Sequence, residues 1–255
     1  MSLRWRLLDT GPAPGPYTAA LDESIARRRA GCEVPDTLHF YQRRPPAVTI
    51  GYSLDAASEV DLGYCRRKGI DVVRRLSGGG AIYTDDRQLV YSLTTKGVLP
   101  SSVAGSLEKV CRALAGGLSA LGADAVFSPV NDVVVNGRKV SGSAQLRKWG
   151  VVLQHGTVLI DTDGEAMFCA LRVPAQKLGK HGLADPASRI TTLRSELGRL
   201  PPMEEVKEAV RKGFADAFGA EISPGRLTDG EAELASELLR TRYGSEEWNL
   251  GMKRR

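Results

Sequence analysis

The sequence has few of the features that mark membrane, secreted or metal-binding proteins. Hydrophobic residues make up 42% of its 255 positions, yet no run of them approaches the roughly 20 residues of a membrane span. Residues 1–5 contain no signal-peptide core. The four cysteines form no Cys-x-x-Cys pair, so neither a zinc pattern nor a disulfide framework is indicated. We therefore expect a cytoplasmic protein that does not bind membranes.

Positive charge is present in slight excess but is not organised into a stripe. The net charge is +5, and short basic runs at 27–29, 66–68 and 253–255 are far apart in the sequence. Nucleic-acid-binding surfaces usually combine a basic stripe with aromatic residues, whereas dispersed runs usually form solvated faces. A basic nucleic-acid-binding protein remains the non-enzyme alternative, but we expect no nucleic-acid partner. The excess charge would also steer an acidic partner protein toward this one.

Residues 74–83 read Arg-Arg-Leu-Ser-Gly-Gly-Gly-Ala-Ile-Tyr and join two permanent cations to a bare backbone. Glycine amides can approach an oxyanion closely, and arginine adds planar donors. No Gly-Lys-Ser/Thr follows, which excludes a Walker loop, and β-like residues on both sides exclude a dinucleotide fingerprint. We predict a strand, a glycine turn and a strand that bind an acyl phosphate or nucleotide; the alternative is an ordinary glycine turn.

A second pattern lies at 131–145, where apolar and polar residues alternate around Asn136-Gly137. Such a pattern predicts a β-hairpin. It places Asn131 and Asp132 at one end and Lys139 just past the turn, on a rigid support. A lysine after a turn is usually only a solvated charge, so the hairpin alone does not decide its role.

The segment 151–161 predicts another strand, and it contains His155-Gly156-Thr157. Glycine within a strand often marks the close approach of a ligand or of another backbone. A strand histidine is more often structural than catalytic. Taken together with the glycine loop and the hairpin, however, these residues indicate one site.

The four blocks, in their order and spacing, resemble the lipoate–protein ligase family within the superfamily of biotin ligases, lipoate ligases and octanoyltransferases. They are Arg-Arg-x-Ser-Gly-Gly-Gly-Ala, Asn-Asp, Asn-Gly-Arg-Lys-Val-Ser-Gly-Ser-Ala-Gln and His-Gly-Thr. The similarity runs from Trp5 to Trp248-Asn249, nearly the whole chain. It implies an α/β (α+β) fold of the class II biotin/lipoyl ligase-like type, with a mostly antiparallel or mixed sheet flanked by helices.

Hydrophobic spacing and breakers place the individual elements. Helices are predicted at 17–29, 60–68, 103–121, 204–218 and 229–243, and strands at 38–41, 48–51 and 70–73. We expect one catalytic domain over 1–255, with a helical C-terminal edge at about 203–245.

The resemblance implies a two-step reaction. Lipoate and ATP give lipoyl-AMP and pyrophosphate with Mg²⁺, and a lysine of an acceptor lipoyl domain then takes the lipoyl group. The acceptor would be a glycine-cleavage carrier protein or a 2-oxoacid dehydrogenase subunit. By resemblance Lys139 is the catalytic residue, contacting both the carboxylate and the α-phosphate, and Asp132 would hold Mg²⁺. The residues expected to bind substrate or adenylate are Arg75, Ser77, Gly78, Gly79, Gly80, Ala81, Ile82, Tyr83, Asn131, Asp132, Ser143, Ala144, His155, Gly156 and Thr157.

Octanoyl and lipoyl amidotransferases are the enzyme alternative, because these relatives carry the acyl group as a thioester on a cysteine. In one group that cysteine precedes the hairpin, where this chain has residues 128–131 without a cysteine. In another it follows the His-Gly strand, near Val173-Pro174, and only Cys169 lies close in sequence. Cys169 is thus the candidate nucleophile for this route. Cys32, Cys65 and Cys111 are expected to be inert thiols.

Two features bear on the activation step. Many family members have His-Asp after the glycine loop, and here Thr84 replaces the histidine. The chain also resembles the short family type, in which the accessory domain is a separate protein. We therefore expect it to bind lipoyl-AMP and transfer from it, while activating free lipoate poorly without that partner.

Overall fold

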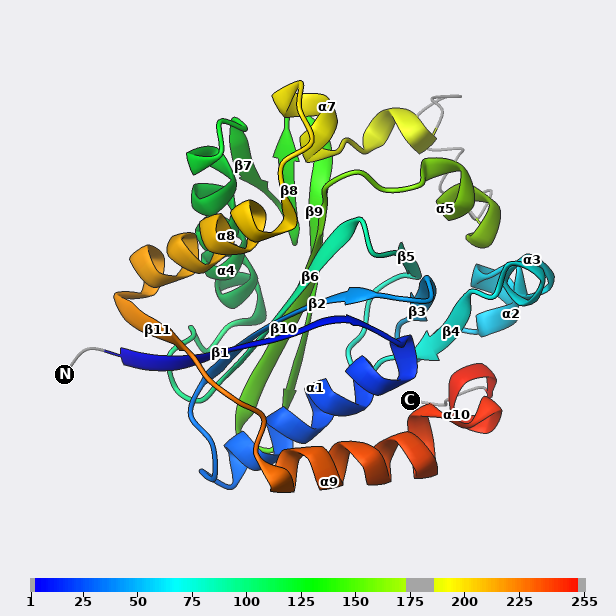
Figure 1. Cartoon of the computed structure of the whole chain (residues 1–255), viewed down its shortest axis with the longest axis horizontal. Coiled ribbons are helices and arrows are strands. Elements are labelled where there is room, and N and C mark those ends of the chain that lie inside the picture. Colours follow the sequence, from blue (N-terminus) through cyan, green and yellow to red (C-terminus); the bar gives the residue numbers. More distant parts are fainter. Residues whose placement is uncertain (1–2, 173–185, 252–255) are drawn as a thin grey trace.

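A computed structural model of the chain describes residues 3–172 and 186–251. Its centre is an eight-stranded sheet in the order β11-β1-β2-β6-β10-β9-β8-β7 (Figure 1). β1 pairs in parallel with both β2 and β11, and the other neighbours are antiparallel. The prediction of a mostly antiparallel, mixed sheet flanked by helices is confirmed.

A second sheet of three strands, in the order β4-β3-β5, lies beside the large one. The strands are β1 (Leu3–Ala13), β2 (Thr37–Arg43), β3 (Ala47–Ile50), β4 (Asp71–Arg74), β5 (Ile82–Thr84), β6 (Gln88–Thr95), β7 (Ala125–Ser128), β8 (Asp132–Val135), β9 (Arg138–Lys148), β10 (Val151–Leu159) and β11 (Ala220–Pro224). The helices are α1 (Gly15–Ala30), α2 (Ala56–Glu59), α3 (Leu62–Lys68), α4 (Val103–Ala120), α5 (Gly164–Ala170), η1 (Pro186–Arg189), α7 (Leu193–Leu197), α8 (Met203–Phe218), α9 (Asp229–Leu238), η2 (Leu239–Tyr243) and α10 (Glu246–Leu250).

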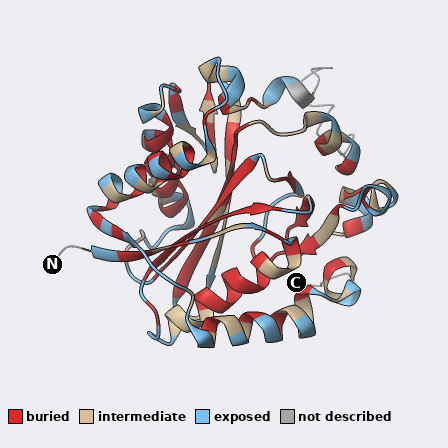
Figure 2. Ribbon diagram, in the orientation of Figure 1, coloured by how far each residue is buried: buried red, intermediate tan, exposed pale blue. Residues whose placement is uncertain are grey.

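Two helix layers cover the large sheet. α4 and α8 pack together over one face, where their apolar residues join the inner face of the sheet in the main core. α1 lies against the other face and is covered in turn by α9 (Figure 1). α1 is consequently a buried helix along much of its length (Figure 2), which allows its polar side chains to reach the interior.

The close contact of α4 with α8 depends on glycine. A Cβ on Gly117 would lie 2.5 Å from the carbonyl oxygen of Ala209, whereas a Cβ on its neighbour Gly116 would meet nothing within 4 Å. We expect Gly117→Ala to lower the free energy of unfolding by about 2 kcal/mol through overpacking. Gly116→Ala should raise it by about 0.5–1 kcal/mol, because alanine favours the helix. Urea titrations of both variants test this, and equal effects would contradict the packing observed.

The small sheet positions the glycine loop. β3 pairs in parallel with β4 and antiparallel with β5, so residues 75–81 leave the sheet by one strand and return by another. α2, α3 and α5 pack on these strands around a separate apolar cluster that includes Val48, Ile50 and Val60. The predicted arrangement of strand, glycine turn and strand is confirmed.

Two predicted boundaries were wrong. The helix predicted at 60–68 begins two residues later, at Leu62, because Asp61 caps it by accepting a hydrogen bond from the amide of Tyr64. The C-terminal edge at 203–245 is not purely helical, because β11 interrupts it and extends the large sheet beside β1.

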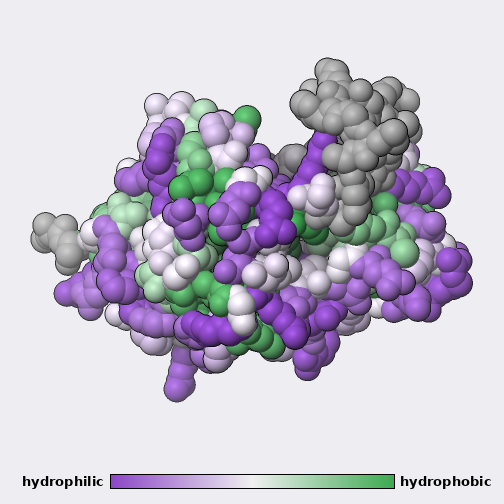
Figure 3. Space-filling view, turned by 90° about the horizontal axis from the view of Figure 1, so that it is seen from above, coloured by the Kyte–Doolittle hydropathy of each residue, from purple (hydrophilic) through white to green (hydrophobic). Residues whose placement is uncertain are grey.

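In the described ranges, 3–172 and 186–251, we find no helix of the length and apolar character needed to cross a membrane. The face shown in Figure 3 carries mainly hydrophilic side chains, with hydrophobic ones in small separate patches between them.

Candidate active site

Arg75 shapes the glycine loop. Its guanidinium donates to the carbonyl oxygens of Gly78 (2.6 Å), Gly80 (2.9 Å) and Thr49 (3.0 Å), and the side chain is only 6% exposed. Gly79 has a φ of 94°, and a Cβ there would lie 2.8 Å from the guanidinium. The loop therefore folds around Arg75 and requires glycine at its centre.

The donors of Arg75 are already engaged within the protein. The sequence predicted that Arg75 would bind the phosphate or nucleotide side of an adenylate; in the structure its guanidinium donates to Ser77 and to the carbonyl oxygens of Thr49, Gly78 and Gly80. Burial lowers the pKa of Arg75 to about 10, so it remains a cation near neutral pH. In the structure, Arg75 stabilises the conformation of the glycine loop.

The hairpin brings Lys139 and Asp132 together. Asn136 and Gly137 both have positive φ, at 49° and 74°, as a two-residue hairpin turn requires. The Lys139 Nζ lies 2.7 Å from Asp132 Oδ1, and the two side chains are 40% and 31% exposed. A Cβ on Gly142 would lie 2.5 Å from Lys139 Nζ. Glycine at 142 thus lets the ammonium group fold back over its own strand.

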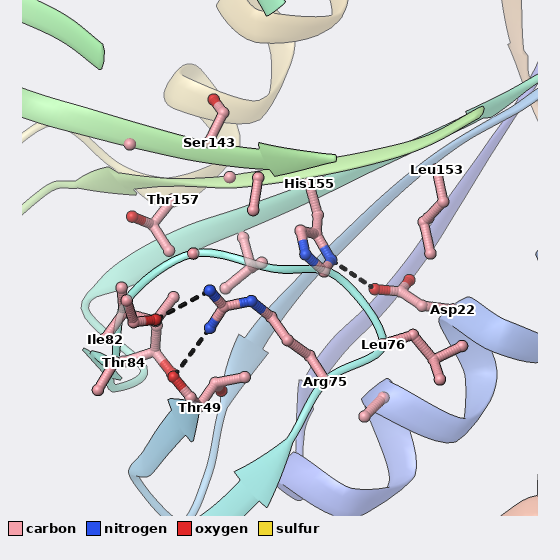
Figure 4. Close-up of a pocket in the computed structure, with 18 of the residues that line it drawn as sticks. Asp22, Thr49, Arg75, Leu76, Ile82, Thr84, Ser143, Leu153, His155 and Thr157 are labelled. Atoms are coloured by element: carbon pink, nitrogen blue, oxygen red, sulfur yellow. Dashed lines mark hydrogen bonds and ion pairs between the residues drawn. The ribbon is translucent and has the colours of Figure 1, made fainter. Parts of the chain in front are cut away.

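A cavity of about 320 Å³ runs between the glycine loop, α1 and the paired strands β9 and β10. Leu153, His155 and Thr157 alternate along β10 and point into it (Figure 4). Ser143 and Thr157 lie toward the end where Lys139 stands, and Leu76 and Leu153 lie toward the other. From Leu153 to Thr157 the strand spans roughly 13 Å. The cavity thus has Lys139 toward one end, and toward the other it has the apolar side chains of Leu76 and Leu153 beside the buried Asp22.

Most of the predicted residues meet at this cavity, although nothing in the structure tests what they bind. Those that line it are Arg75, Gly79, Gly80, Ala81, Ile82, Asn131, Lys139, Ser143, Ala144, His155, Gly156 and Thr157. Thr84, which stands where the family histidine is expected, also lines it. The glycine loop, the hairpin and the His-Gly strand are therefore parts of one site.

Four predicted residues are not among the cavity-lining set: Ser77, Gly78, Tyr83 and Asp132. Asp132 reaches the site through its ion pair with Lys139. Tyr83 packs in the apolar cluster of the small sheet, because neighbouring strand residues point to opposite faces and Ile82 takes the cavity side. Ser77 is only 1% exposed and lies behind His155, bonded to its Nε2 at 2.7 Å.

Packing within the protein also requires glycine at position 156. A Cβ there would lie 2.7 Å from the hydroxyl of Tyr91 and 2.8 Å from the carbonyl oxygen of Gly142. The Tyr91 hydroxyl, on β6, crosses β10 and shares a 2.7 Å hydrogen bond with Ser143 on β9. The close approach that the sequence predicted at this glycine is therefore made by the protein itself.

Several cavity residues were missed in the sequence. Asp22, Glu23, Tyr41, Arg43 and Tyr243 are buried and line the cavity. The sequence did contain a signal for Asp22 and Glu23. Positions 22 and 23 follow the apolar Ala19 by three and four residues, which places them on the same face of the helix.

In the described part of the chain, no cysteine lines the cavity. Cys111 on α4 comes nearest, with its Sγ 3.6 Å from the Ser143 Oγ, but it is buried, and burial raises its pKa to about 11. Cys169 lies exposed on α5, and positions 173–174, the other expected place, fall outside the described residues.

Alkylation should distinguish these thiols. Lys96 lowers the pKa of the exposed Cys32, whereas burial raises that of Cys65 and Cys111 to about 11. Because the thiolate is the reactive form, we expect iodoacetamide near neutral pH to modify Cys32 first and Cys65 and Cys111 far more slowly. Peptide mapping over time measures the rates. Modification of Cys111 as fast as Cys32 would show that the wall behind Ser143 opens.

Comparison with known proteins now decides the family. Residues 14–215 match the model of the lipoyl protein ligase A/B catalytic domain. The chain belongs to this family. It is an enzyme of the lipoate ligase and octanoyltransferase group, and the resemblance seen in the sequence is confirmed.

The proteins similar to it include both octanoyltransferases and lipoate ligases. Octanoyltransferase LipM of Symbiobacterium thermophilum is 37% identical, with 98% of this chain and 99% of the relative covered. LipM of Bacillus subtilis is 27% identical over 96% of this chain and 97% of its own. A bipartite lipoate protein ligase from Thermoplasma acidophilum, solved in a study that includes its E2 lipoyl domain, has a TM-score of 0.86. It shares 30% identity, with 100% of this chain and 98% of that chain covered.

A lipoate–protein ligase A solved with ATP gives a TM-score of 0.84 at 30% identity, with 99% of this chain and 100% of that chain covered. These likenesses extend over the whole mixed sheet and its helices. The fold is that of the lipoate ligase catalytic domain, as expected.

Proposed function

We propose that the protein transfers a medium-length acyl group, octanoyl or lipoyl, to a lysine side chain of a lipoyl-type acceptor domain. The strongest support is the cavity, which leads from the ion-paired Lys139 to the apolar side chains of Leu76 and Leu153, and which follows β10 for roughly 13 Å between Thr157 and Leu153. A medium-length acyl chain has this polarity, with one polar end and an apolar tail. The Thermoplasma acidophilum relative was studied with an E2 lipoyl domain, which supports an acceptor of this kind.

The chemistry needs positive charge at the carbonyl. The acceptor amine attacks the acyl carbon, a C–N bond forms, the bond from carbon to the leaving group breaks, and the amine loses a proton. Negative charge develops on the carbonyl oxygen during this step. In our proposal the Lys139 ammonium stabilises that charge, while Asp132 holds the ammonium in place from 2.7 Å.

For the acyl group and its donor, the names of the relatives favour octanoyl transfer over the ATP-dependent ligation that we predicted first. Eight octanoyltransferases LipM, between 27% and 37% identical, align over nearly the whole chain. We therefore propose octanoyl as the transferred group. The acceptor would be a glycine-cleavage carrier protein or a 2-oxoacid dehydrogenase subunit.

One observation keeps ATP-dependent lipoate ligation as a second candidate. A thioester route needs a thiol at the acyl carbon, and no cysteine among the described residues lines the cavity. Segment 128–131 reaches the cavity through Asn131 but contains no cysteine. In the ligase route the acyl group would arrive as an adenylate, with Lys139 near the α-phosphate. Asp132 is then the carboxylate available for Mg²⁺, which is commonly held by one or two carboxylates and substrate phosphates.

The two routes differ in their donors. We would offer an apo lipoyl domain either octanoyl-acyl carrier protein or octanoate or lipoate with ATP and Mg²⁺, and follow the mass of the domain and the release of pyrophosphate. Octanoylation from the carrier protein alone supports octanoyl transfer. Acylation that requires ATP supports the ligase, and transfer only from preformed acyl-adenylate supports a ligase that needs a separate accessory subunit.

Cysteine variants provide the control. Under octanoyl transfer, Cys169→Ser or Cys111→Ser should abolish acylation from the carrier protein in a folded protein. Full activity of both variants with the carrier-protein donor would exclude these thiols as the nucleophile and would support direct attack of the acceptor amine on the octanoyl donor.

A further inference from the structure

Asp22 on α1 is the centre of a buried polar network that the proposed reaction does not use directly. It is 5% exposed. His39 Nδ1 lies 3.0 Å from its Oδ1, and the Tyr41 hydroxyl donates to Oδ2 at 3.0 Å. His155 Nδ1 approaches Oδ2 at 3.7 Å (Figure 4). One carboxylate thus faces three side chains from two different strands.

The carboxylate is held in its ionised form. Burial would raise the pKa of Asp22, but His155 and His39 together hold it well below its usual value. A carboxylate only accepts hydrogen bonds, so it favours the imidazole tautomer of His155 that carries its proton on Nδ1. In that tautomer Nε2 accepts a hydrogen bond from the hydroxyl of Ser77, 2.7 Å away.

The network continues from Ser77 into the glycine loop. The Ser77 Oγ accepts a hydrogen bond from Arg75 Nε at 3.0 Å, and the same guanidinium holds the carbonyl oxygens of Gly78 and Gly80. The order of groups is therefore Asp22, His155, Ser77, Arg75 and the loop. Every side chain in this series except His155 is more than nine-tenths buried.

Serine, histidine and aspartate in this order also form the nucleophilic triads of hydrolases, but here the serine does not act as a nucleophile. Ser77 is 1% exposed and does not line the cavity, so its hydroxyl cannot reach an acyl carbon there. Its oxygen also accepts from a guanidinium. The arrangement fixes positions and supplies no nucleophile.

We propose that Asp22 is a positioning residue for the acyl-transfer site, acting through His155 and Ser77 to hold Arg75 and the glycine loop against the cavity. The proposal rests on the proposed function for its catalytic meaning, but the coupling of Asp22 to the loop belongs to the free protein. Loss of the carboxylate leaves the His155 ring without a fixed tautomer, and the wall made by Gly79, Gly80 and Ala81 loosens.

A double-mutant cycle between Asp22 and Ser77, which do not touch, tests this. We expect Asp22→Asn and Ser77→Ala each to raise hydrogen exchange at the amides of 78–81 by about 10-fold and to weaken octanoate binding by a similar factor. The double variant should show about the same change as either single one. In acyl transfer, KM for the donor should rise more than kcat falls.

Thr10→Val is the matched control. Thr10 bonds His39 Nε2 at 2.9 Å on the far side of Asp22, away from Ser77, so its effect should multiply with that of Ser77→Ala. If Asp22→Asn does not fold, Tyr41→Phe, which removes the hydrogen bond donated to Asp22 Oδ2, is paired with Ser77→Ala in its place.

The positioning role would be overturned if hydrogen exchange rose evenly along the chain. It would also be overturned if the fold-changes caused by Asp22→Asn and Ser77→Ala multiplied in the double variant. The hydrogen-exchange measurement does not depend on enzyme activity. If the wild-type protein binds no octanoate and transfers no acyl group, the proposed function fails while the exchange cycle still decides the role of Asp22.

Discussion

Replacement of Lys139 by alanine should lower kcat/KM for acyl transfer by at least about 100-fold, the usual cost of removing a group that stabilises an oxyanion. Lys139 provides the ammonium group at one end of the cavity, and Asp132 orients it. The fold should be retained, because the side chain is 40% exposed and packs against no core. Steady-state transfer to an apo lipoyl domain and thermal unfolding of the same preparation measure both effects.

Two further variants make this prediction specific. Lys148→Ala removes an exposed lysine from the same strand, outside the cavity, and should leave transfer near the wild-type rate. Lys139→Arg keeps the charge but not the compact ammonium group, so it should recover only part of the activity. Wild-type activity in Lys139→Ala would make this residue an ordinary solvated lysine.

Gly51→Ala should be the most damaging substitution at the glycine loop. A Cβ on Gly51 would lie 2.1 Å from the carbonyl oxygen of Gly79, a backbone atom that cannot move alone. The loop must shift from β3 as a unit, which we expect to cost about 2–3 kcal/mol in the free energy of unfolding, as for other overpacked sites. Because Gly79 and Gly80 form a wall of the cavity, acyl transfer should fall with it, by about 100-fold for a displacement of an ångström.

Gly78→Ala is the control for stability. Gly78 belongs to the same loop, but a Cβ there would meet nothing within 4 Å, so its free energy of unfolding should change far less. Urea unfolding of the two variants, with donor KM and kcat for Gly51→Ala, makes the comparison. Equal stability of Gly51→Ala and the wild type would contradict the close contact of the loop with β3.

The parts of this site that sequence reasoning found are those specified by local chemistry. A run of three glycines after arginine, and Asn136-Gly137 between alternating residues, determine turns without help from distant segments. The hairpin then fixes the strand that carries Lys139 relative to Asp132. For these elements the pattern predicted the structure well.

The missed parts depend on long-range packing. Nothing local indicates that β11 pairs in parallel with β1, more than 200 residues away, or that α9 covers α1 and buries its polar face. Asp22 was therefore missed in the sequence, although its spacing from Ala19 placed it on the buried side. Tyr83 was misplaced for a simpler reason, since strand alternation allows only one of Ile82 and Tyr83 to face the cavity.

The most direct test of the account is the intact mass of an apo lipoyl domain after incubation with the purified protein and an activated octanoyl donor, either octanoyl-acyl carrier protein or octanoyl-adenylate. We predict the addition of one octanoyl group, on the acceptor lysine, with the wild-type protein and at most about 1% of that rate with Lys139→Ala. A folded wild-type protein that leaves the domain unmodified with both donors would contradict acyl transfer at this site.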